Sequence, residues 1–94
     1  MKLSEMISRE KVNRKLIFDE EGIKAFAIQL KKIRIREGFS QSQLAFESGL
    51  SLSQVARIET ARINPTLSTV FSLARTLNVP LSVLFDFQLS PKEK

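Results

Sequence analysis

The side chains that could do chemistry in this chain are hydrogen-bonding ones, because its 94 residues include neither cysteine nor histidine. That absence removes disulfides, ordinary zinc sites and the Ser-His and Cys-His pairs used in nucleophilic catalysis. We therefore expect a protein that is not an enzyme and that needs no metal or other cofactor. The best candidates for polar recognition lie within residues 41–59.

Those residues have the spacing of two short helices that cross at a tight turn. Ala45 permits a close crossing, and Gly49 supplies the left-handed backbone that ends the first helix. Val55 and Ile58 would fill the contact between the two helices. Each helix begins with a capping-box pattern of a serine and a glutamine three residues later: Ser40 and Gln43, Ser51 and Gln54. The stretch therefore predicts a helix-turn-helix.

The second helix would present an outer face with its own chemistry. Val55, Ile58 and Glu59 fall on its inner side at about 100 degrees per residue. The outer side holds small and polar side chains: Ser53, Ala56, Arg57 and Thr60. Arginine matches the O6 and N7 acceptors of guanine, and a leucine at the first helical position, Leu52, could pack against a thymine methyl. Such a face suits the major groove of duplex DNA.

Apolar residues recur at spacings of three and four on either side of this pair, which predicts an all-α fold of five helices. The three additional helices are expected over residues 23–37, 67–77 and 81–86. Gly38 ends the first of them. Thr66 is placed to cap the second, and Pro80 opens the third.

We expect one domain with an extension at each end. The helical domain spans residues 23–88, the N-terminal extension residues 1–22 and a charged C-terminal tail residues 89–94. Ile28 and Ile35 lie on the side of the first helix that faces away from the core, so they need a cover. We expect apolar residues of the extension to pack there: Leu3, Met6, Ile7, Leu16, Ile17 and Phe18.

The net charge of +5 suits a polyanionic partner, and most of the excess lies early in the chain. Residues 1–37 carry ten Lys and Arg against six Asp and Glu, whereas residues 38–94 carry five against four. A solvated basic face would have the same composition, so charge supports DNA binding without deciding it. No apolar run is long enough for a signal peptide or a membrane span, and we expect a cytoplasmic protein without membrane contact.

Two stretches resemble the XRE family of helix-turn-helix regulators, the phage repressor and Cro type. They are LKKIRIREGFSQSQLAFESGLSLSQVARIE at residues 30–59 and INPTLSTVFSLARTLNVPLSVLF at residues 63–85. The resemblance covers about residues 23–87. Within the family, the chain is similar in particular to small stand-alone regulators such as restriction-modification controller proteins. The resemblance implies a repressor-like domain of five helices. It also implies a dimeric transcription regulator that binds a palindromic operator in double-stranded DNA, with repression favoured over activation.

The resemblance and the helical projection together give a set of candidate DNA contacts. Base contacts are expected from Leu52, Ser53, Gln54 and Arg57. Contacts to the DNA backbone are expected from Gln41, Ser51, Arg62, Asn64 and Thr66. Gln54 is less free to read a base if it serves the cap. Two positions depart from the family: Leu52, where a polar residue is usual, and Ala61, where glycine commonly ends the recognition helix.

Arg34 and Glu59 are expected to form a largely buried ion pair. Arg34 falls on the apolar face of the helix over residues 23–37, and Glu59 falls on the inner side of the recognition helix. Inward-facing charges of opposite sign are costly unless they meet, and an arginine fork suits a carboxylate. The resemblance implies the same pair.

Apolar residues are dense in and beside the short helix expected over residues 81–86: Val79, Leu81, Val83, Leu84, Phe85 and Phe87. Part of this cluster belongs to the core of the subunit, and the alternative that all of it does stays open. A palindromic operator requires two recognition helices about 34 Å apart, which favours a homodimer. The expected interface residues are Leu81, Leu84, Phe85 and Phe87.

Two other functions also stay open. One is an antitoxin that regulates its own gene and binds a toxin protein through the N-terminal extension. The other is a protein-interaction module that uses the helix-turn-helix only as a scaffold. The outer face of the recognition helix argues against the module, because an interface would more often carry large apolar groups.

Overall fold

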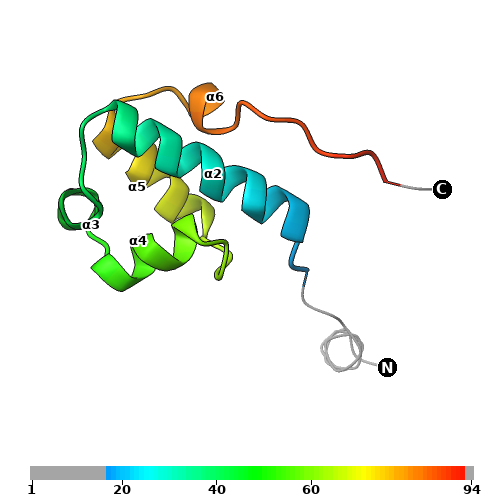
Figure 1. Ribbon diagram of the computed structural model, residues 1–94, viewed down its shortest axis with the longest axis horizontal. Coiled ribbons are helices and arrows are strands. Elements are labelled where there is room, and N and C mark those ends of the chain that lie inside the picture. The colour runs from blue at the N-terminus through cyan, green and yellow to red at the C-terminus, as the bar shows by residue number, and fades with distance from the viewer. Residues whose placement is uncertain (1–16, 93–94) are drawn as a thin grey trace, which may run out of the picture.

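The computed structural model describes residues 17–92, so most of the N-terminal extension expected to cover Ile28 and Ile35 lies outside the described residues. Within this part the chain forms helices and no strand, which confirms the all-α prediction (Figure 1). The helices are α2 (Glu20–Arg36), α3 (Gln41–Ser48), α4 (Leu52–Glu59), α5 (Leu67–Leu77) and α6 (Leu81–Leu84). Their contacts form a closed ring in the order α2, α4, α3, α5, α6 and back to α2.

The first helix of the domain, α2, begins three residues earlier than the sequence predicted. Asp19 is its N-cap and accepts a hydrogen bond from the Gly22 amide at 2.9 Å. Glu20 and Glu21 occupy the first turn, where negative charge interacts favourably with the helix dipole. Apolar periodicity could not detect this turn, because its large apolar residues start only at Ile23.

The other helix ends follow the expected chemistry with two corrections. The Ser40 hydroxyl accepts a hydrogen bond from the Gln43 amide at 3.0 Å, but only Ser51 and Gln54 form both bonds of a capping box. The helix expected near residues 81–86 is shorter and ends at Leu84, where the Phe85 amide closes the last turn on the Leu81 carbonyl. A four-residue helix has little stability of its own, so packing must hold it.

The core lies where the five helices meet. Its least exposed large side chains come from every helix: Leu30, Ile33, Leu44, Val55, Ile58, Leu73, Leu77 and Leu84. On the opposite side of α2, Ile28 and Ile35 are exposed. Burying these core side chains contributes about 1.5 to 3 kcal/mol each to the free energy of folding. The position of α4 is therefore fixed mainly by its packing on the neighbouring helices.

Two polar contacts hold the C-terminal segment against α2. The Gln29 side-chain Nε2 atom donates to the Val83 carbonyl at 2.8 Å. The Ser90 amide and hydroxyl both donate to the Glu21 carboxylate, the hydroxyl at 2.8 Å. Among residues 17–92, no helix has both the length and the apolar character to cross a membrane.

Candidate nucleic-acid interface

The turn between α3 and α4 fixes the angle at which α4 leaves the domain. Gly49 adopts the left-handed conformation with φ of +76°, as predicted, and the Leu50 amide donates back to the Ala45 carbonyl at 2.9 Å. The Ser72 hydroxyl of α5 donates to the Ser48 carbonyl at 2.7 Å, which satisfies one of the free carbonyls at the end of α3. The turn is therefore held by both local and tertiary hydrogen bonds.

The two sides of α4 differ as the projection predicted. Val55, Ile58 and Glu59 are buried, whereas Ser53 and Arg57 on the outer side are exposed. Leu52 and Gln54, which flank the outer side in the first turn, are exposed as well. Within residues 17–92, no carboxylate pairs with the Arg57 guanidinium. The guanidinium is thus available to an external acceptor.

The capping box at the start of α4 limits what Gln54 can do. The Ser51 hydroxyl accepts from the Gln54 amide at 3.1 Å, and the Gln54 side-chain Oε1 accepts from the Ser51 amide at 2.9 Å. Both serine and glutamine are therefore engaged in the cap. The Gln54 side chain retains its Nε2 donors for a ligand.

The inner side of α4 ends in a buried polar network. The Arg34 Nε and Nη2 atoms donate to the two oxygens of Glu59 at 2.6 Å and 3.0 Å, so the ion pair expected from the sequence is present. The Glu59 side chain is only 2% exposed. Arg34 Nη1 also donates to the Phe39 carbonyl at 2.9 Å. This bidentate pair joins the end of α2 to the end of α4.

Gln41 joins the same network, which the sequence did not predict. Its Nε2 atom donates to Glu59 Oε1 at 3.0 Å. Gln41 is the first residue of α3, so the carboxylate links α2, α3 and α4. Helical periodicity describes one helix at a time, and the only available signal was that Gln41 and Glu59 both stand at ends of the paired helices. Among the residues described, Nε2 makes this one hydrogen bond, so its second hydrogen can donate to a ligand.

The end of α4 resolves the departure at Ala61. The helix stops at Glu59, and Ala61 itself adopts the left-handed conformation with φ of +59°. The Arg62 amide donates to the Arg57 carbonyl at 2.9 Å, as in a helix end that normally uses glycine. An alanine in this conformation carries a backbone strain of about 1 to 2 kcal/mol. The helix therefore ends in a left-handed turn at an alanine, where glycine is the residue that such a turn favours.

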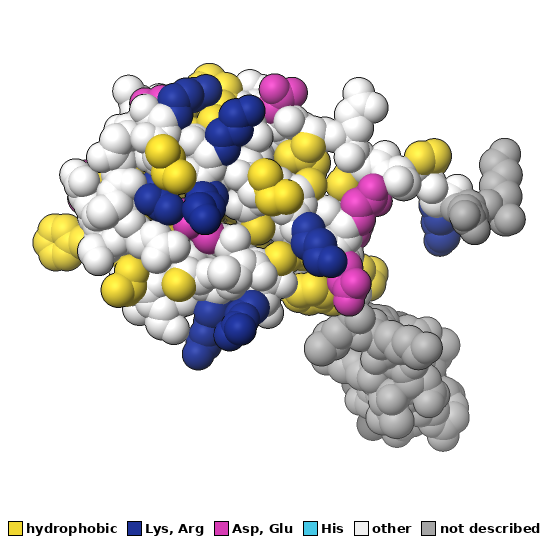
Figure 2. Space-filling view, in the orientation of Figure 1, with side chains coloured by type: hydrophobic (Ala, Val, Ile, Leu, Met, Phe, Trp, Pro, Cys, Tyr) yellow, Lys and Arg dark blue, Asp and Glu magenta, His cyan; other side chains and the backbone are white. Residues whose placement is uncertain are grey.

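The residues expected to hold the DNA backbone lie on both flanks of α4. Ser51 precedes it, while Arg62, Asn64 and Thr66 follow it on the exposed segment before α5. Figure 2 shows that Lys and Arg side chains are spread over this view of the molecule among hydrophobic and uncharged ones, with no single basic patch. On the face in this view, the candidate interface is therefore distinguished by the geometry of α4 more than by a concentration of charge.

A second exposed surface lies on α5 and α6, and one correction concerns it. Leu84 was expected at a dimer interface, but it is fully buried in the core of the subunit, so no partner can reach it. Leu81 and Phe85 are 41% and 42% exposed, and Phe87 is half-buried. Phe85 also stacks on Phe26 with ring centroids 5.5 Å apart. The short helix therefore faces the core on one side and solvent on the other.

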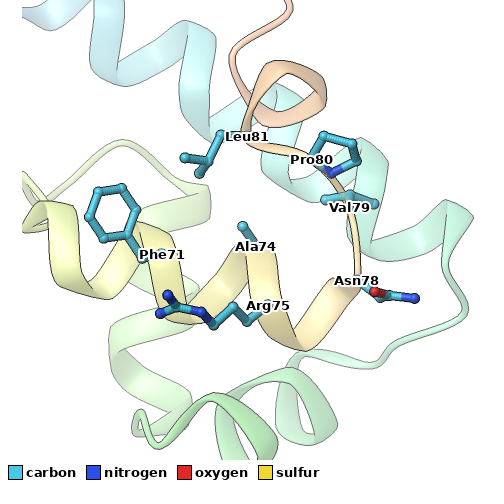
Figure 3. Close-up of a pocket in the computed structure, with 7 residues that line it drawn as sticks. All are labelled: Phe71, Ala74, Arg75, Asn78, Val79, Pro80 and Leu81. Carbon is cyan, nitrogen blue, oxygen red and sulfur yellow. The ribbon is translucent and has the colours of Figure 1, made fainter.

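Beside this helix runs an open groove of about 500 Å³. Figure 3 shows Phe71, Ala74 and Arg75 of α5 along one side of the groove and Val79, Pro80 and Leu81 along the other. Phe71 is 37% exposed. We use the name apolar face of α5 and α6 for three exposed side chains: Phe71 of α5, Leu81 of α6 and Phe85, which directly follows α6.

Comparisons with known proteins agree with this geometry. Residues 30–84 match the family model described as helix-turn-helix. The chain is 40% identical over 57 residues to the HTH-type transcriptional regulator SutR of Escherichia coli, and 38% identical over 66 residues to the regulator SlrR of Bacillus subtilis. These matches cover 61% and 69% of this chain, but it spans only 32% and 43% of the two relatives.

Solved structures give the same result. The restriction-modification controller protein of Aeromonas hydrophila superposes with a TM-score of 0.65 at 35% identity, over 67% of this chain and 96% of that protein. The chain therefore belongs to the helix-turn-helix family of DNA-binding transcription regulators, the XRE type that the sequence resembles.

Proposed function

We propose that this chain is a sequence-specific transcription regulator that places α4 in the major groove of operator DNA and has no enzymatic role. The observation that carries the proposal is the division of α4. Its inner side is fixed by core packing and by Glu59, and its outer side presents Ser53 and Arg57 to solvent. A helix held on one side and free on the other is what insertion into a groove requires.

The remaining candidate residues would set the register of α4 on the duplex. Gln41 lies at the N-terminus of α3, where backbone amides and the helix dipole favour a phosphate. Its side chain is oriented by Glu59 and keeps one hydrogen for a phosphate oxygen. The other backbone contacts are assigned to the exposed flanks of α4: Ser51, Arg62, Asn64 and Thr66. Such contacts position the protein without reading sequence.

We further propose that two copies bind a palindromic operator and repress by covering the promoter. The apolar face of α5 and α6 supports a two-fold dimer, because Leu81 and Phe85 are large, apolar and about two-fifths exposed. A dimer through this face would place two recognition helices on half-sites about one helical turn apart. Leu84 takes no part in this interface.

Selection of bound duplexes from a random pool tests the function directly. We expect enrichment of an inverted repeat with half-site centres about 10 base pairs apart. Binding to the selected duplex should weaken steeply as salt rises, since phosphate contacts release counterions. A chain that enriches no sequence, and binds duplex DNA no better than an unrelated acidic polymer, would contradict the proposal.

The dimer is tested by a charge on its apolar face. Leu81→Asp should give a folded monomer by sedimentation, with weak operator binding. Leu81 is a better site than Phe85 for this change, because Phe85 stacks on Phe26 of the core. Wild-type chain that stays monomeric at tens of micromolar, both free and on the operator, would exclude the dimer.

A further inference from the structure

The first residue of α4 is an apolar side chain at the tip of the recognition helix. Leu52 follows the Ser51 N-cap and is 50% exposed. In an α-helix each Cα–Cβ bond tilts toward the N-terminus, so the leucine side chain projects toward the end that would enter the groove. Leu52 would therefore be among the first side chains to meet the base edges.

The neighbouring polar residue cannot read adenine in the usual way. Glutamine recognises adenine with both ends of its amide, the oxygen toward N6 and the nitrogen toward N7. The Gln54 Oε1 atom already accepts the Ser51 amide at 2.9 Å. Unless the cap breaks, Gln54 offers only donors. Among the residues described, no side-chain hydrogen bond or ion pair engages Ser53 or Arg57, so the direct readers are then these two residues and the exposed Leu52.

We propose that Leu52 reads a thymine through its C5 methyl group, and that Arg57 reads a guanine about two base steps away. The rise of an α-helix places Arg57 about 7.5 Å beyond Leu52 along the axis. One base step along a strand is about 3.4 Å, so α4 lying along the stacked bases would bring these two side chains to bases about two steps apart. The inference rests on the proposed function and adds the two bases that each half-site must contain.

The apolar side chain of Leu52 explains why it should prefer thymine to the other bases. The thymine methyl is the apolar group that a base pair presents in the major groove, and the other base edges there present donors or acceptors. Opposite Leu52, such a donor or acceptor would lose its water without gaining a partner. Leucine therefore favours thymine both by burying the methyl group and by disfavouring the alternatives.

Replacement of thymine by uracil isolates the contact, because uracil differs from thymine only in lacking the C5 methyl. The operator selected by the wild-type chain is substituted one thymine at a time, and its binding to wild-type and Leu52→Ala chains is compared. At one thymine in each half-site we expect uracil to weaken wild-type binding about three- to fivefold. The Leu52→Ala chain should bind the thymine and uracil duplexes equally.

A second base analogue tests the predicted spacing. Substitution of 7-deazaguanine removes the N7 acceptor of one guanine, about two steps from the sensitive thymine. We expect this to weaken wild-type binding and to leave the Arg57→Ala chain unaffected. A sensitive guanine five or more steps from the thymine would overturn the proposed spacing.

Leu89→Ala is the matched control, because Leu89 is also 50% exposed and lies in the C-terminal segment, far from α4 in sequence. It should keep the full response to uracil. A wild-type chain that binds its operator without any uracil-sensitive position would overturn the thymine assignment, and so would sensitivity that persists in Leu52→Ala. Either outcome leaves the proposed function intact, whereas failure to select any duplex would overturn both.

Discussion

The two sides of α4 use charged side chains in opposite ways. On the inner side, the Glu59 carboxylate is buried and accepts hydrogen bonds from Arg34 and Gln41. On the outer side, Arg57 is exposed and pairs with no carboxylate among the residues described. A charge with several fixed partners holds the helix in place, and a charge with none is available for binding. In this domain, stability and recognition should therefore separate according to the side of one short helix.

The largest expected effect is on the inner side. Arg34→Met should lower the free energy of unfolding by about 3 to 5 kcal/mol, because it leaves the Glu59 carboxylate buried with only Gln41 as a partner. Glu59→Leu should lower the free energy of unfolding by a similar amount, because it leaves the Arg34 guanidinium without its carboxylate partner. Denaturant unfolding of each variant measures these losses.

The double variant is the control for this pair. Arg34→Met with Glu59→Leu removes both charges and should recover a large part of the loss, as apolar replacements of buried ion pairs often do. If each single variant lost less than about 1 kcal/mol of unfolding free energy and the two losses simply added, Arg34 and Glu59 would behave as a solvent-exposed ion pair.

The outer side should give the opposite result. Arg57→Ala should weaken operator binding by about 1 to 3 kcal/mol and leave unfolding within about 0.5 kcal/mol of wild type. Arg57→Lys keeps the charge but loses the planar fork, so it should leave affinity for scrambled DNA at the wild-type level without restoring selectivity for the operator. Equal losses on operator and scrambled duplexes would make Arg57 a phosphate contact.

Gln41 of α3 contacts the inner side of α4 through Glu59 and is also a candidate contact to the DNA backbone. Its replacement should therefore reduce both stability and DNA binding, each by a smaller amount. Gln41→Ala should lower the free energy of unfolding by about 1 kcal/mol through the lost hydrogen bond to Glu59. It should also weaken binding to operator and scrambled DNA by the same factor, since phosphate contacts carry no sequence information. Titrations on both duplexes beside unfolding curves test this, and an effect on the operator alone would contradict it.

The smallest effect concerns the backbone at the end of α4. Ala61→Gly should raise the free energy of unfolding by about 0.5 to 1 kcal/mol, because glycine adopts the left-handed conformation without strain. Gly49→Ala is the matched reverse change, since Gly49 has φ of +76° and an added Cβ would meet no neighbouring atom within 4 Å. It should lower stability by a comparable amount. Destabilisation by Ala61→Gly would show that the alanine methyl makes a contact worth more than the strain.

The sequence predicted most of the helical pair because periodicity and capping act over three or four residues. Val55 and Ile58 had to face inward, and a charged Glu59 on the same side required a partner, which Arg34 supplies. Contacts between helices were less accessible. The link from Gln41 to Glu59 depends on how far apart two helix ends lie, and the burial of Leu84 depends on how α6 closes against α2. The start of α2 was placed three residues late because its acidic first turn, although suited to the helix dipole, carries no apolar signal.

The shared carboxylate of Glu59 also bears on how α4 can open. An isolated helix of eight residues is marginal in water, so the backbone amides of α4 owe their protection to tertiary contacts. Because Glu59 is held from α2 and α3 at once, α4 cannot detach without breaking the contacts of both. Its interior amides should consequently exchange with solvent deuterium only through global unfolding, whereas those of the C-terminal segment exchange through smaller openings.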